Sequence, residues 1–194
     1  MLKIILLIIF ITNSFLYADE GMWEPYQMKG LKKELRTSGY NRNVSNVSDL
    51  FKHPMSAIVS LGGCSAAFVS DEGLIATNYH CIERGFLQFN SNSETDLFET
   101  GFVARTKNAE KRSAPGSRVY VTLESTEITE QVLKNLNDET QDIERAKIIE
   151  KNIKEIISVC ETSDEIECRV RSFFSGETYK LEKVLKIKEF GVIY

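Results

Sequence analysis

The residues with the clearest potential for chemistry lie in one stretch, GGCSAAFVSDEGLIATNYHC, which runs from Gly62 to Cys81. It holds two of the four cysteines and one of the two histidines of the chain, and His80 directly precedes Cys81. An imidazole suits general-base work because its pKa lies near neutral pH. Two thiols can form a disulfide, and thiolates with an imidazole can bind zinc. The stretch therefore has the composition of a catalytic element, a structural hairpin or a metal site.

The residues before His80 have the pattern of a β-hairpin. Apolar and β-branched runs, CSAAFV and LIATN, flank the turn-forming residues SDEG. Folding the chain about this turn places Val69 near Leu74 and Cys64 near Tyr79, so Cys81 comes within bridging reach if the chain bends after Asn78. A Cys64–Cys81 disulfide would fix the backbone on both sides of His80 and contribute about 3 kcal/mol through the unfolded state.

Spacing alone leaves other interpretations of this histidine open. His80 at a hairpin end can be a structural residue whose ring is satisfied by a neighbouring backbone group. A zinc site is disfavoured because adjacent side chains at positions 80 and 81 are expected to point apart and the chain has no CxxC pair. We therefore expect no metal and no cofactor. His53, next to Pro54, has no acidic or thiol neighbour and is expected to be a surface or packing residue.

The N-terminus has the layout of a secretory signal. One lysine precedes the apolar run Ile4 to Ile11, and a polar break and Ala18 follow. The run is short for a membrane span, so cleavage after Ala18 is expected, with an N-terminal anchor as the alternative. The mature chain would be periplasmic or secreted, with no stable membrane insertion. In an oxidising compartment four cysteines favour two disulfides; three pairings are possible, and Cys64/Cys81 and Cys160/Cys168 are natural neighbours.

The rest of the chain predicts a mainly β domain with a helical insertion. A hydrophobic content of 42% indicates a globular protein, and a net charge of −4 without a dense basic run gives no reason to expect nucleic acid as a partner. A short helix is predicted around Leu31 and Leu35, ending near Gly39. Further strands are predicted in GFLQFN, in SRVYVTLEST and in the C-terminal YKLEKVLKIKEFGVIY.

The helical insertion is predicted from an amphipathic pattern. A short helix is expected around Thr129 to Leu136, and Asp138 with Gln141 resembles a capping box before a longer one. Apolar residues of the longer helix recur at helical spacing, namely Ile143, Ala146, Ile149, Ile153, Ile156 and Cys160. The expected organisation is a signal at 1–18, an N-terminal arm and first barrel strands at 19–124, a helical segment at 125–165 and returning strands at 166–194. Because the sequence stops on an apolar strand, we expect an N-terminal fragment of a longer protein.

A histidine directly before a disulfide-bonded cysteine, after a strand, resembles the base of chymotrypsin-like serine proteases. Four blocks in order narrow the resemblance: DEGMW, GGCSAAFVSDEGLIATNYHC, GFVARTKNAEKRSAPGSRVYV and ECRVRSFFSGETYKL. Together they resemble the bacterial serine dipeptidyl peptidases of peptidase family 46, the dipeptidyl-peptidase 7 and 11 type. The resemblance implies a chymotrypsin-like double β-barrel with an inserted helical domain, release of dipeptides from peptide N-termini, His80 as the triad base and Cys64–Cys81 as the adjoining disulfide.

The same resemblance places the other parts of the site elsewhere. The catalytic Asp and Ser, the oxyanion hole and the groups that bind the substrate's amino terminus are expected beyond residue 194, and TSGY and FSGE do not match a GDSG-like motif. A lone histidine supplies neither a nucleophile nor oxyanion stabilisation, so negligible peptidase activity is expected of these residues alone. The alternative is a secreted, non-catalytic binding protein that keeps this part of the barrel.

Overall fold

A computed structural model describes residues 23–137 and 139–193 of the chain. These residues divide between two compact units, with the boundary after Leu50. The predicted signal segment, residues 1–18, lies outside the described residues. Among the helices that are described, none combines the length and the apolar character needed to cross a membrane.

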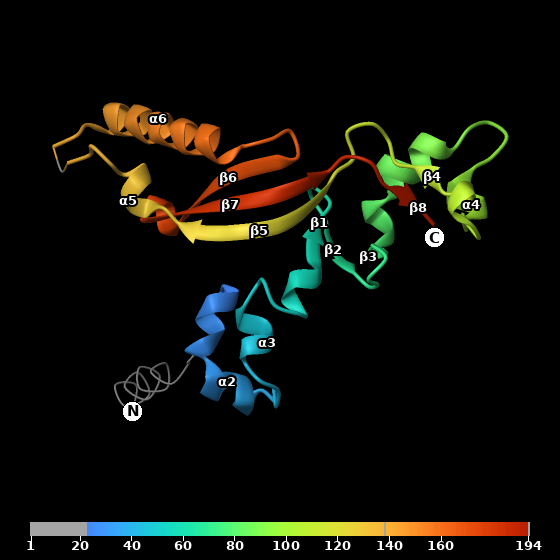
Figure 1. Ribbon diagram of the computed structural model, residues 1–194, viewed down its shortest axis with the longest axis horizontal. Helices are drawn as coiled ribbons and strands as arrows, with labels where there is room; N and C mark the ends of the chain where they lie inside the picture. The colour runs from blue at the N-terminus through green and yellow to red at the C-terminus, as the bar shows by residue number, and fades with distance from the viewer. Residues whose placement is uncertain (1–22, 138, 194) are drawn as a thin grey trace, which may run out of the picture. The chain divides into compact units, whose positions relative to one another are not determined.

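The first unit consists of short helices. A 3₁₀ helix at Pro25–Lys29 precedes α2 (Lys32–Thr37) and α3 (Ser45–Ser48), as Figure 1 shows. Proline at the first position and reciprocal hydrogen bonds between Glu24 and Gln27 start the 3₁₀ helix, because both satisfy or remove free backbone donors. The helix predicted around Leu35 is confirmed as α2, and the chain turns at Gly39, whose φ is +92°.

The second unit is built on a six-stranded antiparallel sheet with the order β3-β2-β1-β5-β7-β6 (Figure 1). The strands are β1 (Ile58–Ser60), β2 (Ser65–Phe68), β3 (Ile75–Thr77), β5 (Val119–Glu127), β6 (Ile166–Phe173) and β7 (Thr178–Ile187). A separate pair joins β4 (Lys111–Arg112) to β8 (Gly191–Val192). The mainly β prediction is confirmed. Within the described residues the sheet is open, with β3 and β6 at its two edges.

One face of the sheet carries the hydrophobic core beneath the hairpin. Val59 pairs with Ala66 on one side and with Val121 on the other, so all three share a face. With Val119, which is 1% exposed, Val59 and Ala66 form a buried cluster against which Phe68, Ile75 and Ile187 pack. This cluster anchors the hairpin that precedes His80.

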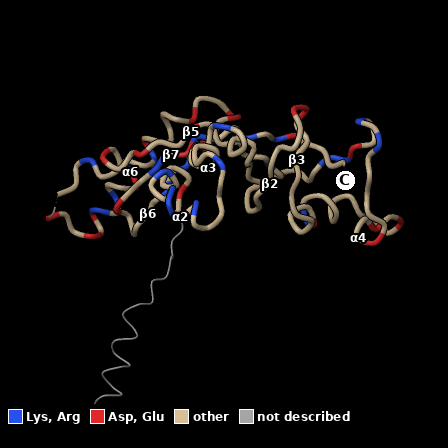
Figure 2. The backbone as a smooth tube through the Cα atoms, turned by 90° about the horizontal axis from the view of Figure 1, so that it is seen from below, with Lys and Arg blue, Asp and Glu red and all other residues tan. Residues whose placement is uncertain are grey.

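The helices α5 (Thr129–Val132) and α6 (Asp142–Cys160) form a second core with β6 and β7 (Figure 1). Ile149, Ile153 and Ile156 pack against a buried cluster of Ile128, Val132 and Tyr179. Residues of both charges occur along α6 (Figure 2), and the exposed side chains of Lys154 and Glu150 form an ion pair at 2.6 Å. The amphipathic prediction is therefore confirmed for the middle of the helix.

The first turns of α6 differ from the prediction. Ile143 is 75% exposed and Ala146 is also exposed, because the buried cluster contacts only the later turns. The helix begins after Gln141 and has no side-chain cap, while Asp138 is outside the described residues. The amide of Glu139 and the hydroxyl of Thr140 both donate to Asn137 Oδ1, and this local turn delays the helix start. Gln141 is the residue directly before the helix and not its third residue, so the predicted capping box is wrong.

The strand predicted in GFLQFN is also wrong. Residues Glu83–Gln88 form a single-turn π-helix, followed after a loop by α4 (Leu97–Thr100). A strand would place the adjacent Phe86 and Leu87 on opposite faces, whereas both are buried here with Leu97. The amides of Phe86 and Leu87 both donate to the carbonyl of Ile82. The spacing of Ile82, Phe86 and Leu87 is a helical signal within an apolar run too short to distinguish helix from strand.

Candidate active site

The segment that carries His80 is a three-stranded meander with two tight turns. Gly62 and Gly63 join β1 to β2, with Leu61 donating its amide to the carbonyl of Cys64 and Gly62 at a φ of +83°. At the second turn the Ser70 hydroxyl accepts from the amide of Leu74 at 3.0 Å. A positive φ is readily adopted only by glycine, which explains the residue types at these turns.

The hairpin register places the two cysteines as the sequence predicts. Val69 donates its amide to the carbonyl of Leu74, and Ala66 lies opposite Thr77. Beyond Thr77 the chain leaves the strand and enters a 3₁₀ turn at Tyr79–Cys81, in which Cys81 donates to the carbonyl of Asn78. The predicted bend after Asn78 is confirmed. It turns the chain back over the open end of the hairpin.

The sulfur atoms of Cys64 and Cys81 are bonded to each other, with their Cα atoms 5.9 Å apart. The bond joins the first residue of the hairpin to the residue after His80. Together with the strand before it and the 3₁₀ turn around it, the disulfide restrains the backbone of His80 from both sides. The backbone position from which the His80 side chain extends is therefore fixed, as a general base requires.

The imidazole of His80 is exposed to solvent, and one of its ring nitrogens lies within 4.8 Å of both disulfide sulfurs. Across residues 23–137 and 139–193, no backbone or side-chain group makes a hydrogen bond to this ring. The bond to a neighbouring backbone group that the structural interpretation expects is therefore absent among these residues. Both ring nitrogens are available to a nucleophile on one side and an orienting acid on the other.

The same three residues have the donor types of a zinc site, and one prediction about them is wrong. Adjacent side chains at 80 and 81 were expected to point apart, yet their donor atoms lie within 4.8 Å of each other. Both sulfurs are nevertheless joined in a disulfide, and a disulfide lacks the thiolate charge that zinc binding uses. As folded, the cluster offers zinc a single good ligand.

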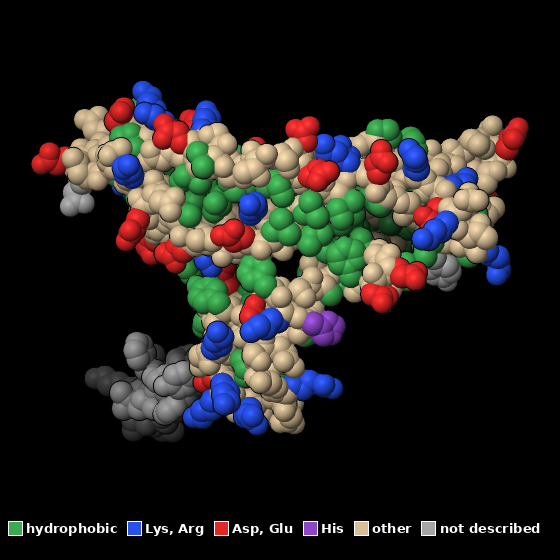
Figure 3. Space-filling model, viewed as in Figure 1, with side chains coloured by type: hydrophobic (Ala, Val, Ile, Leu, Met, Phe, Trp, Pro, Cys, Tyr) green, Lys and Arg blue, Asp and Glu red, His purple; other side chains and the backbone are tan. Residues whose placement is uncertain are grey.

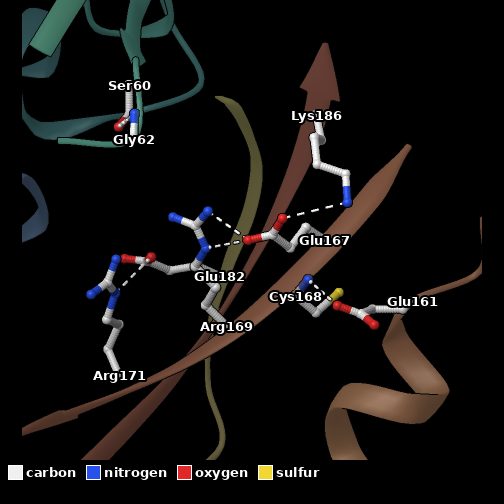
Figure 4. A network of polar contacts seen from close by, with 9 residues as sticks. All are labelled: Ser60, Gly62, Glu161, Glu167, Cys168, Arg169, Arg171, Glu182 and Lys186. Atoms are coloured by element: carbon white, nitrogen blue, oxygen red, sulfur yellow. Dashed lines mark hydrogen bonds and ion pairs between the residues drawn. The ribbon is translucent and has the colours of Figure 1, made fainter. Parts of the chain in front are cut away.

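A polar network lies on β6 and β7, at the edge of the sheet opposite β3 (Figure 4). Glu167 on β6 accepts from Arg169 Nε at 2.7 Å, and its other oxygen lies 3.5 Å from Lys186 Nζ on β7. The guanidinium of Arg169 stacks 4.2 Å from the ring centroid of Tyr120. Because Tyr120 pairs with Ser60 on β1, the network connects the β6–β7 edge to the strand that leads into the hairpin.

The charges of this network shift the pKa values of its members. Partial burial acts to raise the pKa of Glu167, but hydrogen bonds and attraction from Arg169 and Lys186 outweigh it and lower that pKa below its usual value. Burial likewise acts to lower the pKa of Arg169, and its contacts with Glu167 and Tyr120 outweigh this and raise it. Both groups therefore stay charged at neutral pH. The sequence analysis did not identify this network, since alternating charges on a strand usually indicate only a solvated face.

The second disulfide joins the end of α6 to β6. Cys160 and Cys168 are bonded, with their Cα atoms 6.1 Å apart, and the amide of Cys168 donates to the carboxylate of Glu161 (Figure 4). This is the pairing expected from the sequence, and it joins the helical segment to the returning strands. The part of the chain described by the structure contains no free cysteine.

The sequence of this chain matches a known protein family. The sequence model of the Peptidase S46 family matches residues 18–194. The chain belongs to the peptidase S46 family. Among its curated relatives, an Asp/Glu-specific dipeptidyl-peptidase of Shewanella putrefaciens is 36% identical over 95% of this chain. One from Capnocytophaga gingivalis is 34% identical over 89%, and dipeptidyl-peptidase 7 of Porphyromonas gingivalis is 31% identical over 84%.

The chain is short beside these S46 relatives. It spans 25% of the Shewanella and Capnocytophaga proteins and 23% of the Porphyromonas protein. Crystal structures of DPP11 from Porphyromonas endodontalis share its fold. One in an alternate conformation matches 91% of this chain and 27% of its own with a TM-score of 0.76 and 21% identity. A complex with the dipeptide Arg-Glu matches 90% and 27% at a TM-score of 0.71. The described sheet and helix are thus part of the S46 fold.

Proposed function

We propose that the protein containing this chain is a serine-type dipeptidyl peptidase that releases dipeptides from the free N-terminus of peptides. In this proposal His80 is the general base. It accepts the proton of an attacking serine hydroxyl and then donates it to the leaving amine, while an aspartate orients its other nitrogen. The serine, the aspartate and the oxyanion hole belong to the part of the protein outside these 194 residues.

The observation that carries the proposal is the setting of His80. Its backbone is restrained by a strand, a 3₁₀ turn and a disulfide, yet its ring is exposed and makes no hydrogen bond within the described residues. A catalytic base needs both ring nitrogens for its partners, and here neither nitrogen is engaged within the described residues while the backbone is held in place. Membership of the S46 family, whose curated relatives are named dipeptidyl-peptidases, points to the same role.

Two further features complete the proposal. The N-terminal residues 1–18 act as an export signal that is removed, which places the mature protein in the periplasm or outside the cell, where both disulfides are stable.

Peptides with an acidic residue at the second position from the N-terminus are the first substrates to test, since the 36% identical relative is named Asp/Glu-specific. Residues 19–194 alone are expected to be inactive.

The test is hydrolysis of fluorogenic dipeptidyl amides by the full reading frame that contains this chain. Matched substrates differ only in whether the amino terminus is free or acetylated and in whether the second residue from the N-terminus is acidic or apolar. The proposal expects cleavage of the free-amino substrates, no cleavage of the acetylated ones, and inactivation by a fluorophosphonate that reacts with catalytic serines. A folded full-length protein that cleaves none of them is the result expected of a non-catalytic binding protein.

A further inference from the structure

The first unit gathers basic side chains that the sequence disperses over residues 29–42. Figure 3 shows Lys and Arg side chains concentrated over the segment that contains α2 and α3. Four of them, Lys29, Lys32, Arg36 and Arg42, line a hollow of about 560 Å³ together with Asn41, Asn43, Val44 and Ser45. Lys32 and Arg36 share one face of α2 because they are four residues apart.

The charge in this hollow is not balanced. None of the described residues that line it is acidic, and the four cations make no ion pair within the described residues. The chain as a whole has a net charge of −4, so the charge of this hollow is opposite in sign to that of the chain. Unpaired like charges repel one another, and the arrangement gains most from an anion that several of them bind together.

The loop that forms one wall of the hollow is held in shape by its own hydrogen bonds. The Asn43 side-chain oxygen accepts from the amide of Ser45 at 3.0 Å, and the Asn43 carbonyl accepts from the Tyr40 hydroxyl at 3.2 Å. Val44 between them is 8% exposed and anchors the loop. The side-chain amide nitrogen of Asn43 is a donor that has no hydrogen-bond acceptor among the described residues.

We propose that this hollow is an anion site that binds a phosphate group. A carboxylate offers one charge and two oxygens, which would leave most of the four cations unbalanced. A phosphate ester offers up to two charges and several acceptor oxygens, and the arginine guanidinium matches that geometry with two parallel bonds. The group can belong to a soluble phosphate compound or to a lipid headgroup, and both present the same chemistry to these residues.

The test compares three forms of the full-length protein. Lys32→Gln with Arg36→Gln removes two cations from the hollow, and Lys147→Gln with Arg105→Gln removes two exposed cations from the other unit. Each form is titrated calorimetrically with inorganic pyrophosphate and is cosedimented with vesicles of phosphatidylglycerol mixed with phosphatidylcholine, or of phosphatidylcholine alone. Unfolding curves establish that the variants are folded.

We expect the Lys32→Gln/Arg36→Gln form to bind about tenfold more weakly, the loss expected for one or two charge-assisted hydrogen bonds, and the Lys147→Gln/Arg105→Gln form to bind like the wild type. Binding of pyrophosphate identifies a soluble phosphate ligand, and binding only to phosphatidylglycerol vesicles identifies a headgroup. Binding should weaken as salt is added. The proposal is overturned if the wild type binds neither probe, or if both double variants weaken binding equally.

Discussion

Cys64 is bonded to Cys81, the residue directly after His80, across a Cα–Cα distance of 5.9 Å. This bond closes the open end of the hairpin and restrains the backbone on the C-terminal side of the histidine, while β3 restrains it on the N-terminal side. The disulfide therefore has two separable effects, one on the free energy of unfolding and one on the position of the imidazole.

Replacing this pair, as Cys64→Ser with Cys81→Ser, should lower the free energy of unfolding by about 3 kcal/mol, because the unfolded chain regains the entropy of an open loop. If the proposed function holds, it should also lower kcat of the full-length protein, because the backbone at His80 is then less restrained. Denaturant unfolding and steady-state kinetics measure the two effects.

The matched control is Cys160→Ser with Cys168→Ser, which opens a shorter loop in the helical region. It should cost a comparable free energy of unfolding, about 2.5 kcal/mol, with little change in kcat. Equal losses of kcat in the two double variants, at a temperature where both are folded, would show that the first disulfide does not position His80.

Gly62→Ala should destabilise the second unit by about 1 kcal/mol, because Gly62 has a φ of +83° that an alanine adopts only with strain. Gly63→Ala adds the same methyl group at the next residue, where φ is not positive and no atom lies within 4 Å of the new carbon. Thermal unfolding of both variants checks this. A larger loss for Gly63→Ala would contradict the assigned turn.

Glu167→Gln should lower the free energy of unfolding by about 1 kcal/mol near neutral pH, since Arg169 and Lys186 both lose their anionic partner. The folded pKa of Glu167 lies below its ordinary value of 4.5, so its contribution is complete above that pH and disappears as the pH falls through the folded pKa. Urea unfolding across the acid range should therefore show the wild type and the variant converging at low pH.

The control for that change is Glu182→Gln, whose ion pair with Arg171 is more exposed. It should change stability by no more than about 0.5 kcal/mol. If the wild type kept the same excess in free energy of unfolding over Glu167→Gln in strong acid, the charged network would be ruled out as the source of that excess.

Asn152→Asp should destabilise the packing of α6 by about 3 kcal/mol. The buried Asn152 side-chain nitrogen donates to the carbonyls of Val132 and Lys134, both at 2.9 Å, and a carboxylate would place negative charge against those oxygens. Protonation restores a donor, so the penalty should shrink as the pH falls. Asn108→Asp, at an exposed position, makes the same chemical change and should be nearly neutral; calorimetric melting distinguishes the two.

The sequence predicted the parts of this fold whose signals are local. The SDEG turn and the spacing of Cys64, His80 and Cys81 determine the hairpin register and the bend, and the isoleucine spacing identifies α6. Other features depend on contacts distant in sequence. Phe86 and Leu87 form a π-helix because Leu97 and Phe102 cover both of them, and Glu167 becomes a structural anion because β7 brings Lys186 beside it. The serine and the aspartate that we propose as partners of His80 have no matching motif in this segment, so the sequence carried no local signal for them.

The most direct test of the central claim compares His80→Ala with His53→Ala in the full-length protein, measured as kcat for a dipeptidyl amide. The two histidines are the only ones among these 194 residues, and both are exposed. If His80 is the general base, its replacement should reduce kcat by about 10⁴-fold or more without unfolding the protein, whereas His53→Ala should retain wild-type kcat. Equal kcat for His80→Ala and the wild type would contradict the assignment.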